Sequence, residues 1–148
     1  LKVNPLVLEL CGRKTPVTTP EAKLSVYHSA AAAAIAGRMT EQEYAREFVA
    51  DPAVVALRAK VNAIADASIR EDEADAVIEC DGKTFHHHVD YVAGSTRRPM
   101  SDADIEAKFR GLASPVLTAG AIDKLIAQCW AITDAPDAAV LAKLATPN

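Results

Sequence analysis

The sequence predicts an α+β fold, in which a small antiparallel or mixed sheet is covered by about six helices. The first observation is a change to period-two apolar spacing on both sides of Asp81-Gly82, which predicts a β-hairpin over about residues 75–92. The second is a set of helix-start signals, Thr18 with Glu21 and Thr40 with Glu43 before that hairpin and Ser101 after it. The predicted order of elements, β-ααα-(β)-ββ-ααα, is therefore that of an α+β fold.

The composition is that of an ordinary globular domain. The chain has 148 residues, 50% apolar and 24% charged, so we expect a single domain over residues 1–148, with two small domains as the alternative. A net charge of −4 gives no reason to expect nucleic acid or an anionic membrane as a partner, and no apolar run reaches the roughly 18 residues of a membrane span. Three widely spaced cysteines without a CxxC pair favour a reducing cytoplasm over a disulfide framework or a zinc ribbon.

The first ten residues read as a strand. Leu6, Leu8 and Leu10 alternate with other residues, and Pro5 would confine the strand's start to an edge or a bulge. The chain begins at Leu1, without methionine and inside this strand-like segment. We therefore expect it to be a fragment of a longer protein.

Residues 18–37 carry the longest helix signal in the first half of the chain. Thr18 caps its start, Pro20 occupies the first turn, and Gly37 follows the last apolar residue. Small alanines at 30–34 would allow another backbone to approach closely. Polar side chains at the front of this helix, Lys23, Tyr27 and His28, lie on or beside the face predicted to be buried.

The remaining elements follow from further caps and apolar spacing. A short helix is predicted after Thr40 and a helix from Asp51 to about Asn62, and the apolar residues within 62–69 allow a strand. After the hairpin and a loop, helices are predicted to begin near Ser101, Leu117 and Pro136.

Four successive blocks of the sequence resemble a known family. They are PEAKLSVYHSAAAAAIAG, DPAVVALRAKV, the strand–CDGK–strand hairpin and RRPMSDADIEAKFRGLA. In this order and spacing they look like the C-terminal domain of the MmgE/PrpD family, which includes 2-methylcitrate dehydratase, cis-aconitate decarboxylase and iminodisuccinate epimerase. The resemblance covers nearly the whole chain.

The resemblance implies a fold and an activity. Enzymes of this family join a large helical domain to a smaller α+β lid domain, form homodimers, and act on small di- or tricarboxylates in the cleft between the domains, without metal or organic cofactor. The resemblance also implies that this chain is the C-terminal fragment of a longer two-domain protein. It would be the lid domain of a lyase or isomerase, inactive without the helical domain, which carries most of the acid and base side chains. The alternative is a non-catalytic dimerisation or interaction module whose exposed apolar surface binds a partner chain.

A carboxylate substrate requires cations and hydrogen-bond donors, and the loop Gly12-Arg13-Lys14 with the front of the following helix could supply them. Lys23 and Tyr27, at i and i+4, would share one helix face, with His28 beside them. Lys23, Tyr27 and His28 are thus the catalytic candidates, and Arg13 and Lys23 are substrate-binding candidates. Alternatively, Lys23 is solvated, and Tyr27 and His28 are core-edge residues with satisfied polar tips.

Two further clusters could bind ligands. Arg97 and Arg98 could clamp a carboxylate bidentately, or could form a surface loop with weak salt bridges. Of the three histidines at 86–88, only His86 and His88 can face the same side of a strand, and no familiar spacing completes a tetrahedral metal set. We therefore expect no metal site.

Overall fold

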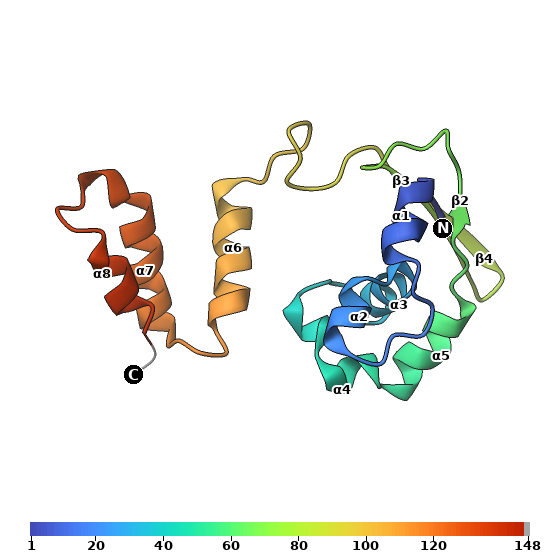
Figure 1. The fold of residues 1–148 in the computed structure, drawn as a ribbon, viewed down its shortest axis with the longest axis horizontal. Coiled ribbons are helices and arrows are strands. Elements are labelled where there is room, and N and C mark those ends of the chain that lie inside the picture. Colours follow the sequence, from blue (N-terminus) through green and yellow to red (C-terminus); the bar gives the residue numbers. More distant parts are fainter. Residues whose placement is uncertain (147–148) are drawn as a thin grey trace. The chain divides into compact units, whose positions relative to one another are not determined.

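A computed structural model describes residues 1–146, which form two compact units, one from Leu1 to Arg98 and one that begins at Pro99. The predicted α+β class is confirmed, with helices and one small mixed sheet (Figure 1). The first unit contains β1 (Lys2–Val3), α1 (Pro5–Cys11), α2 (Thr19–Lys23), α3 (Val26–Ala36), the 3₁₀ helix η1 (Glu41–Tyr44), α4 (Arg46–Val49), α5 (Pro52–Lys60), β2 (Ile64–Ala65), β3 (Ala74–Cys80) and β4 (Lys83–Val89). The second contains α6 (Asp102–Ala113), α7 (Ala119–Trp130), the 3₁₀ helix η2 (Ile132–Asp134) and α8 (Ala139–Leu144).

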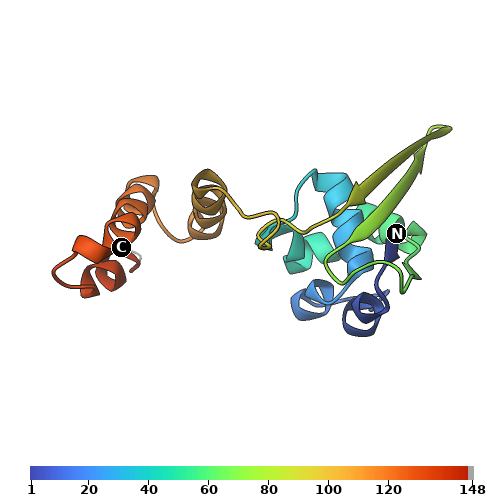
Figure 2. The ribbon, with the colours of Figure 1, turned by 90° about the horizontal axis from the view of Figure 1, so that it is seen from above.

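The sheet has the strand order β2-β1-β3-β4, with β1 and β2 parallel and the other neighbours antiparallel. The predicted hairpin is confirmed as β3 and β4. Its turn residues Asp81 and Gly82 have positive φ angles of 51° and 72°, as a two-residue hairpin turn requires. The tip of this hairpin extends past the helices of its own unit (Figure 2).

The predicted strand over Leu1–Leu10 is wrong beyond Val3. Residues Pro5–Cys11 form α1 because the Asn4 side chain accepts a hydrogen bond from Leu6 N at 3.0 Å and caps the helix. Pro5 occupies the first helical position, where its missing N–H costs nothing. Asn4 also donates through Nδ2 to the carbonyl of Ile69 at 2.7 Å, which fixes the chain where it leaves the sheet.

The predicted continuous helix over residues 18–37 is two helices. Both of its predicted ends are confirmed, since Thr18 and Glu21 form a capping box and Gly37 adopts a left-handed conformation with φ 67°. Between them, α2 ends at Lys23, and Ser25 is extended and caps α3 by accepting from His28 N at 3.0 Å. Ser25 also forms an antiparallel bridge with Gly12, so a contact with a distant part of the chain interrupts the helix.

The other predicted elements occur with shifted bounds. The short helix predicted after Thr40 is divided into η1, which the Thr40–Glu43 capping box opens, and α4. Asp51 caps α5, and Ser101 caps α6. Of the possible strand within residues 62–69, only Ile64–Ala65 pairs, as β2.

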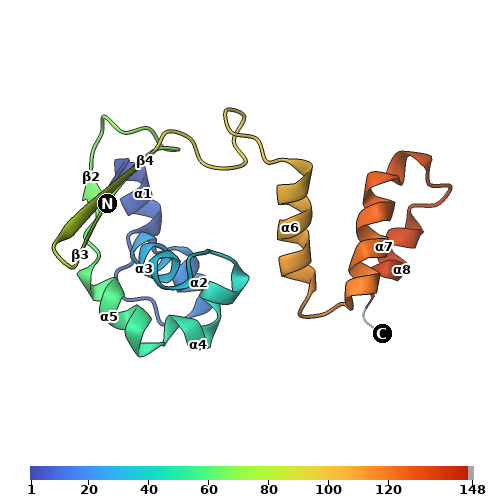
Figure 3. The same cartoon turned by 180° about the vertical axis from the view of Figure 1, so that it is seen from behind.

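Each unit has its own apolar interior. In the first, α3 packs against α5, with Ala31, Ala32 and Val54 buried (Figure 3). In the second, Ala113 of α6 lies against Ile122 and Ile126 of α7. No helix within residues 1–146 combines the length and the apolar character needed to cross a membrane.

Candidate functional site

The Arg13–Lys14 loop is attached to the junction of α2 and α3. Gly12 pairs with Ser25, and the buried Ser25 hydroxyl donates to the Arg13 carbonyl at 2.5 Å. A Cβ atom at Gly12 would lie 2.1 Å from the carbonyl oxygen of Leu8, so only glycine allows this close approach to α1. These contacts hold the backbone of the Gly12-Arg13-Lys14 loop, the first cationic loop predicted from the sequence, in one position.

Each cation near this junction has a different partner. Arg13 Nη1 lies 2.6 Å from Glu21 Oε1, and Lys23 Nζ lies 2.7 Å from Glu41 Oε2. Their side chains are 54% and 44% exposed, and exposed ion pairs contribute only about 0–1 kcal/mol. A substrate carboxylate could therefore replace Glu21 or Glu41 at little cost.

Lys14 and Lys23 also lie against aromatic rings. Lys14 Nζ is 5.6 Å from the ring centroid of Tyr27, and Lys23 Nζ is 6.0 Å from that of Tyr44. Within residues 1–146 no carboxylate forms an ion pair with Lys14. Lys23 and Tyr27 thus belong to separate helices and contact different partners, although the sequence placed them on one helix face.

His28 lies in the interior. Its Nε2 atom is 2.8 Å from the Glu43 carbonyl oxygen, and its Nδ1 atom is 3.4 Å from Arg58 Nη1. Because a guanidinium can only donate, Nδ1 accepts and Nε2 carries the proton that it donates to Glu43. Burial lowers the pKa of His28, and the Arg58 charge lowers it further against the opposing effect of the Glu43 carbonyl. The imidazole is therefore neutral, and both of its nitrogens are occupied.

A buried polar cluster surrounds His28, and sequence reasoning did not identify it. Burial alone would raise the pKa of the Glu43 carboxyl, but hydrogen bonds from Thr40 and Arg38 lower it to about 2. Arg58 donates to the Val49 carbonyl at 3.3 Å. The Thr40–Glu43 capping box and the position of Arg58, four residues after the core residue Val54, were the available signals.

Aromatic contacts connect this cluster to the lysine side. The rings of His28 and Tyr44 are 5.8 Å apart, and the Tyr44 hydroxyl lies 3.2 Å from the Ser29 hydroxyl. Tyr44 also lies beneath Lys23. The exposed cations Arg13, Lys14 and Lys23 can bind an anion. The His28 imidazole is buried, and both of its nitrogens already have partners within the protein.

The other sequence candidates lie elsewhere in the first unit. Arg97 and Arg98 are exposed on a tight loop closed by a 2.8 Å hydrogen bond from Gly94 N to the Arg98 carbonyl. In the described part of the chain no ion pair joins either guanidinium to a carboxylate. On the hairpin, the Asp75 carboxylate lies 2.6 Å from His88 and 3.4 Å from His86, and residues 1–146 contain no group of three or more side chains placed to hold a metal.

Comparison with known proteins identifies the family. The family model described as MmgE/PrpD C-terminal domain matches residues 1–132. Human cis-aconitate decarboxylase is 29% identical over 143 residues, which cover 93% of this chain and 30% of the relative. This chain therefore spans less than a third of the length of that relative. Because the family model matches most of its length, the chain belongs to the MmgE/PrpD family and contains the C-terminal domain of that family.

Proposed function

We propose that this chain is the lid domain of a cofactor-independent lyase or isomerase that acts on a small di- or tricarboxylate. The observation that carries the proposal is the family match over residues 1–132, together with a relative named for the decarboxylation of a tricarboxylate. In this proposal the domain is inactive alone, and a helical domain of the parent protein completes the active site. The parent is a cytoplasmic homodimer that resembles 2-methylcitrate dehydratase.

The charges of the first unit support a role in substrate binding. Arg13, Lys14 and Lys23 are exposed cations beside α2, and their exposed ion pairs are weak enough to be exchanged for a ligand carboxylate. Arg97 and Arg98 form a second group of exposed cations that could bind a substrate carboxylate. His28, neutral and occupied at both nitrogens, leaves the general base to the rest of the parent.

The test is an assay of the parent protein against 2-methylcitrate, cis-aconitate and iminodisuccinate, with and without a chelator, in parallel with the 148-residue chain. We expect the parent to turn over one of these carboxylates in the presence of the chelator, and the 148-residue chain to turn over none. Turnover by the short chain alone, or a parent inactive on every carboxylate, would contradict the proposal.

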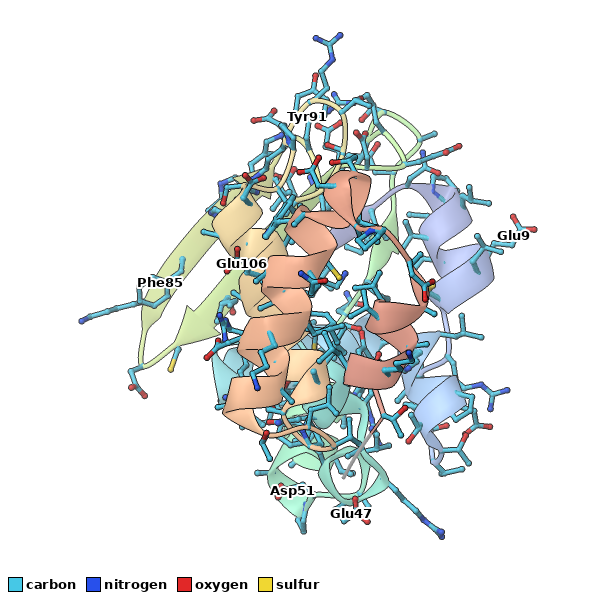
Figure 4. The ribbon with its side chains drawn as sticks, turned by 90° about the vertical axis from the view of Figure 1, so that its left-hand side faces the viewer. Glu9, Glu47, Asp51, Phe85, Tyr91 and Glu106 are labelled. Carbon is cyan, nitrogen blue, oxygen red and sulfur yellow. The ribbon has the colours of Figure 1, made fainter. Side chains whose placement is uncertain are left out.

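A second candidate is a non-catalytic dimerisation or interaction module. Exposed apolar side chains on the first unit favour it, among them Ile35, Ile64 and Phe85, the last labelled on the hairpin in Figure 4. Sedimentation of the parent would discriminate the two. Association that depends on these side chains, in a protein without turnover, favours the module.

A further inference from the structure

Strand β3 has an open edge. Strand β1 pairs only with its first two residues, Ala74 and Asp75, whereas β4 pairs with its whole length. On the β1 side, residues 76–80 of β3 therefore have no neighbouring strand among the described residues. An edge of this kind presents unpaired backbone groups to another strand.

The register identifies which backbone groups are unpaired. The carbonyls of Leu1 and Val3 accept from Ile64 N and Asp66 N, so these residues point their backbone groups toward β2, and Lys2 points toward β3. Lys2 lies opposite Asp75, and backbone direction alternates along a strand. The peptide groups of Val77 and Glu79 therefore face the open edge.

An apolar groove of about 960 Å³ runs beside this edge. Its walls include Leu1, the α3 alanines Ala33 and Ala34, Leu57 of α5, and Ile78 of β3. The side chain of Ile78, 52% exposed, faces this groove, whereas that of Val77, also 52% exposed, lies on the opposite face of β3. Because alanines have short side chains, a strand added to β3 can lie close to α3.

We propose that this edge takes the polypeptide that precedes Leu1 in the parent protein, as a direct continuation of β1 antiparallel to β3. The proposal rests on the part of the proposed function that places this chain in a longer protein. The residue immediately before Leu1 then lies opposite Val77, and the third residue before Leu1 lies opposite Glu79. The α-amino nitrogen of Leu1 is already in a strand position, 2.7 Å from the Asn62 carbonyl oxygen.

The same register fixes the side-chain pattern of the added strand. Val3 is 3% exposed and Lys2 is exposed, so the faces of β1 alternate inward and outward. The second residue before Leu1 faces inward, opposite Ile78 and toward the groove, and is expected to be apolar. We assign the open edge of β3 to the segment that precedes Leu1 rather than to a second copy of the chain. The preceding segment is covalently joined to β1, so it can pair with β3 without the entropic cost of association.

The first measurement is amide hydrogen exchange in the parent and in the 148-residue chain. The amides of Val77 and Glu79 are expected to exchange at least about tenfold more slowly in the parent. The His86 amide is the internal reference, because the same alternation directs it to the outer edge of β4. Equal exchange at Val77 and Glu79 in the two proteins would overturn the proposal.

A cross-link tests the register. In a parent with its native cysteines replaced by serine, a cysteine immediately before Leu1 is expected to form an intrachain disulfide with Val77→Cys and none with the matched control Ile78→Cys, whose side chain faces inward. A disulfide between two chains would instead assign the edge to a second copy and overturn the proposal. The cross-link does not depend on turnover, so a linked but inactive parent contradicts only the proposed function, and an active parent without the link contradicts only the added strand.

Discussion

The Nε2 atom of His28 lies 2.8 Å from the backbone carbonyl oxygen of Glu43, and this contact connects α3 to η1 inside the first unit. Arg58 of α5 lies at the other ring nitrogen. One imidazole thus joins three elements of the fold. Its polar neighbours make it part of the interior, so the ligand contacts that we propose for this unit are the exposed cations beside α2.

Replacement of His28 is expected to lower stability. His28→Ala removes a fully buried ring, leaves the Glu43 carbonyl without a partner and takes from Arg58 Nη1 one of its two acceptors, the other being the Val49 carbonyl. We expect a cost of about 2–4 kcal/mol. Urea denaturation measures the loss. The matched control is His87→Ala on the exposed hairpin, expected to change stability by no more than about 0.5 kcal/mol. Equal effects of the two substitutions would show that His28 is not a structural link.

Stability is expected to depend on pH with opposite signs at two histidines. The pKa of His28 is lowered from 6.5 by burial, so its contribution is complete above pH 6.5 and decreases as the pH falls below it. The pKa of His88 is raised by its hydrogen bond to Asp75, so its contribution is present below pH 6.5 and is lost as the pH rises through the folded-state pKa. Unfolding of His28→Gln and His88→Gln, followed between about pH 5 and pH 8, should therefore show changes of slope in opposite directions. Slope changes in the same direction for both variants would contradict the lowered pKa of His28 or the raised pKa of His88.

Glu43 is expected to make the first unit sensitive to acid. Its pKa is about 2 in the folded chain against an ordinary 4.5, so its contribution, on the order of 3 kcal/mol, is present above pH 4.5 and is lost as the pH falls toward 2. Glu43→Gln should flatten this part of the stability curve. The comparison is made as a difference from the wild type, because Glu21, Asp66 and Asp75 also have lowered pKa values. An unchanged curve would exclude Glu43 as the source.

Gly12 is expected to tolerate no side chain. Gly12→Ala would place Cβ 2.1 Å from the Leu8 carbonyl oxygen, and the displacement of the Arg13 loop should cost about 1–3 kcal/mol. Gly111→Ala is the control, because Gly111 lies within α6 with no atom within 4 Å of its added Cβ, and it should stabilise by about 0.5–1 kcal/mol. Thermal unfolding of both variants measures the contrast. A neutral Gly12→Ala would show that the loop is free to move.

The parts of the fold set by neighbouring residues could be predicted from the sequence. The hairpin follows from Asp81-Gly82, and the capping boxes at Thr18, Thr40 and Ser101 depend on residues three positions apart. In the first ten residues, Leu6, Leu8 and Leu10 suggested a strand, but Asn4-Pro5 was the stronger signal because the cap and the proline both act at the start of a helix.

The rest depends on contacts across the chain. The break at Ser25 follows from its pairing with Gly12, and His28 meets Glu43 and Arg58, which lie 15 and 30 residues further along. Helix periodicity alone therefore left His28 open as a catalytic candidate. Arg13 and Lys23 could be selected as cations from the sequence, but their pairing with Glu21 and Glu41 depends on how the chain folds.

The most direct test of the account is the effect of the cations beside α2 on substrate binding by the parent enzyme. For the double variant Lys14→Met and Lys23→Met, loss of charge-assisted contacts to a substrate carboxylate predicts a KM about 10–100-fold higher, with kcat within about threefold of wild type. Lys83→Met, at the exposed first residue of β4, is the matched control and should leave both constants unchanged. A double variant whose KM equals that of the control would contradict the proposal that this domain binds the substrate carboxylate through these lysines.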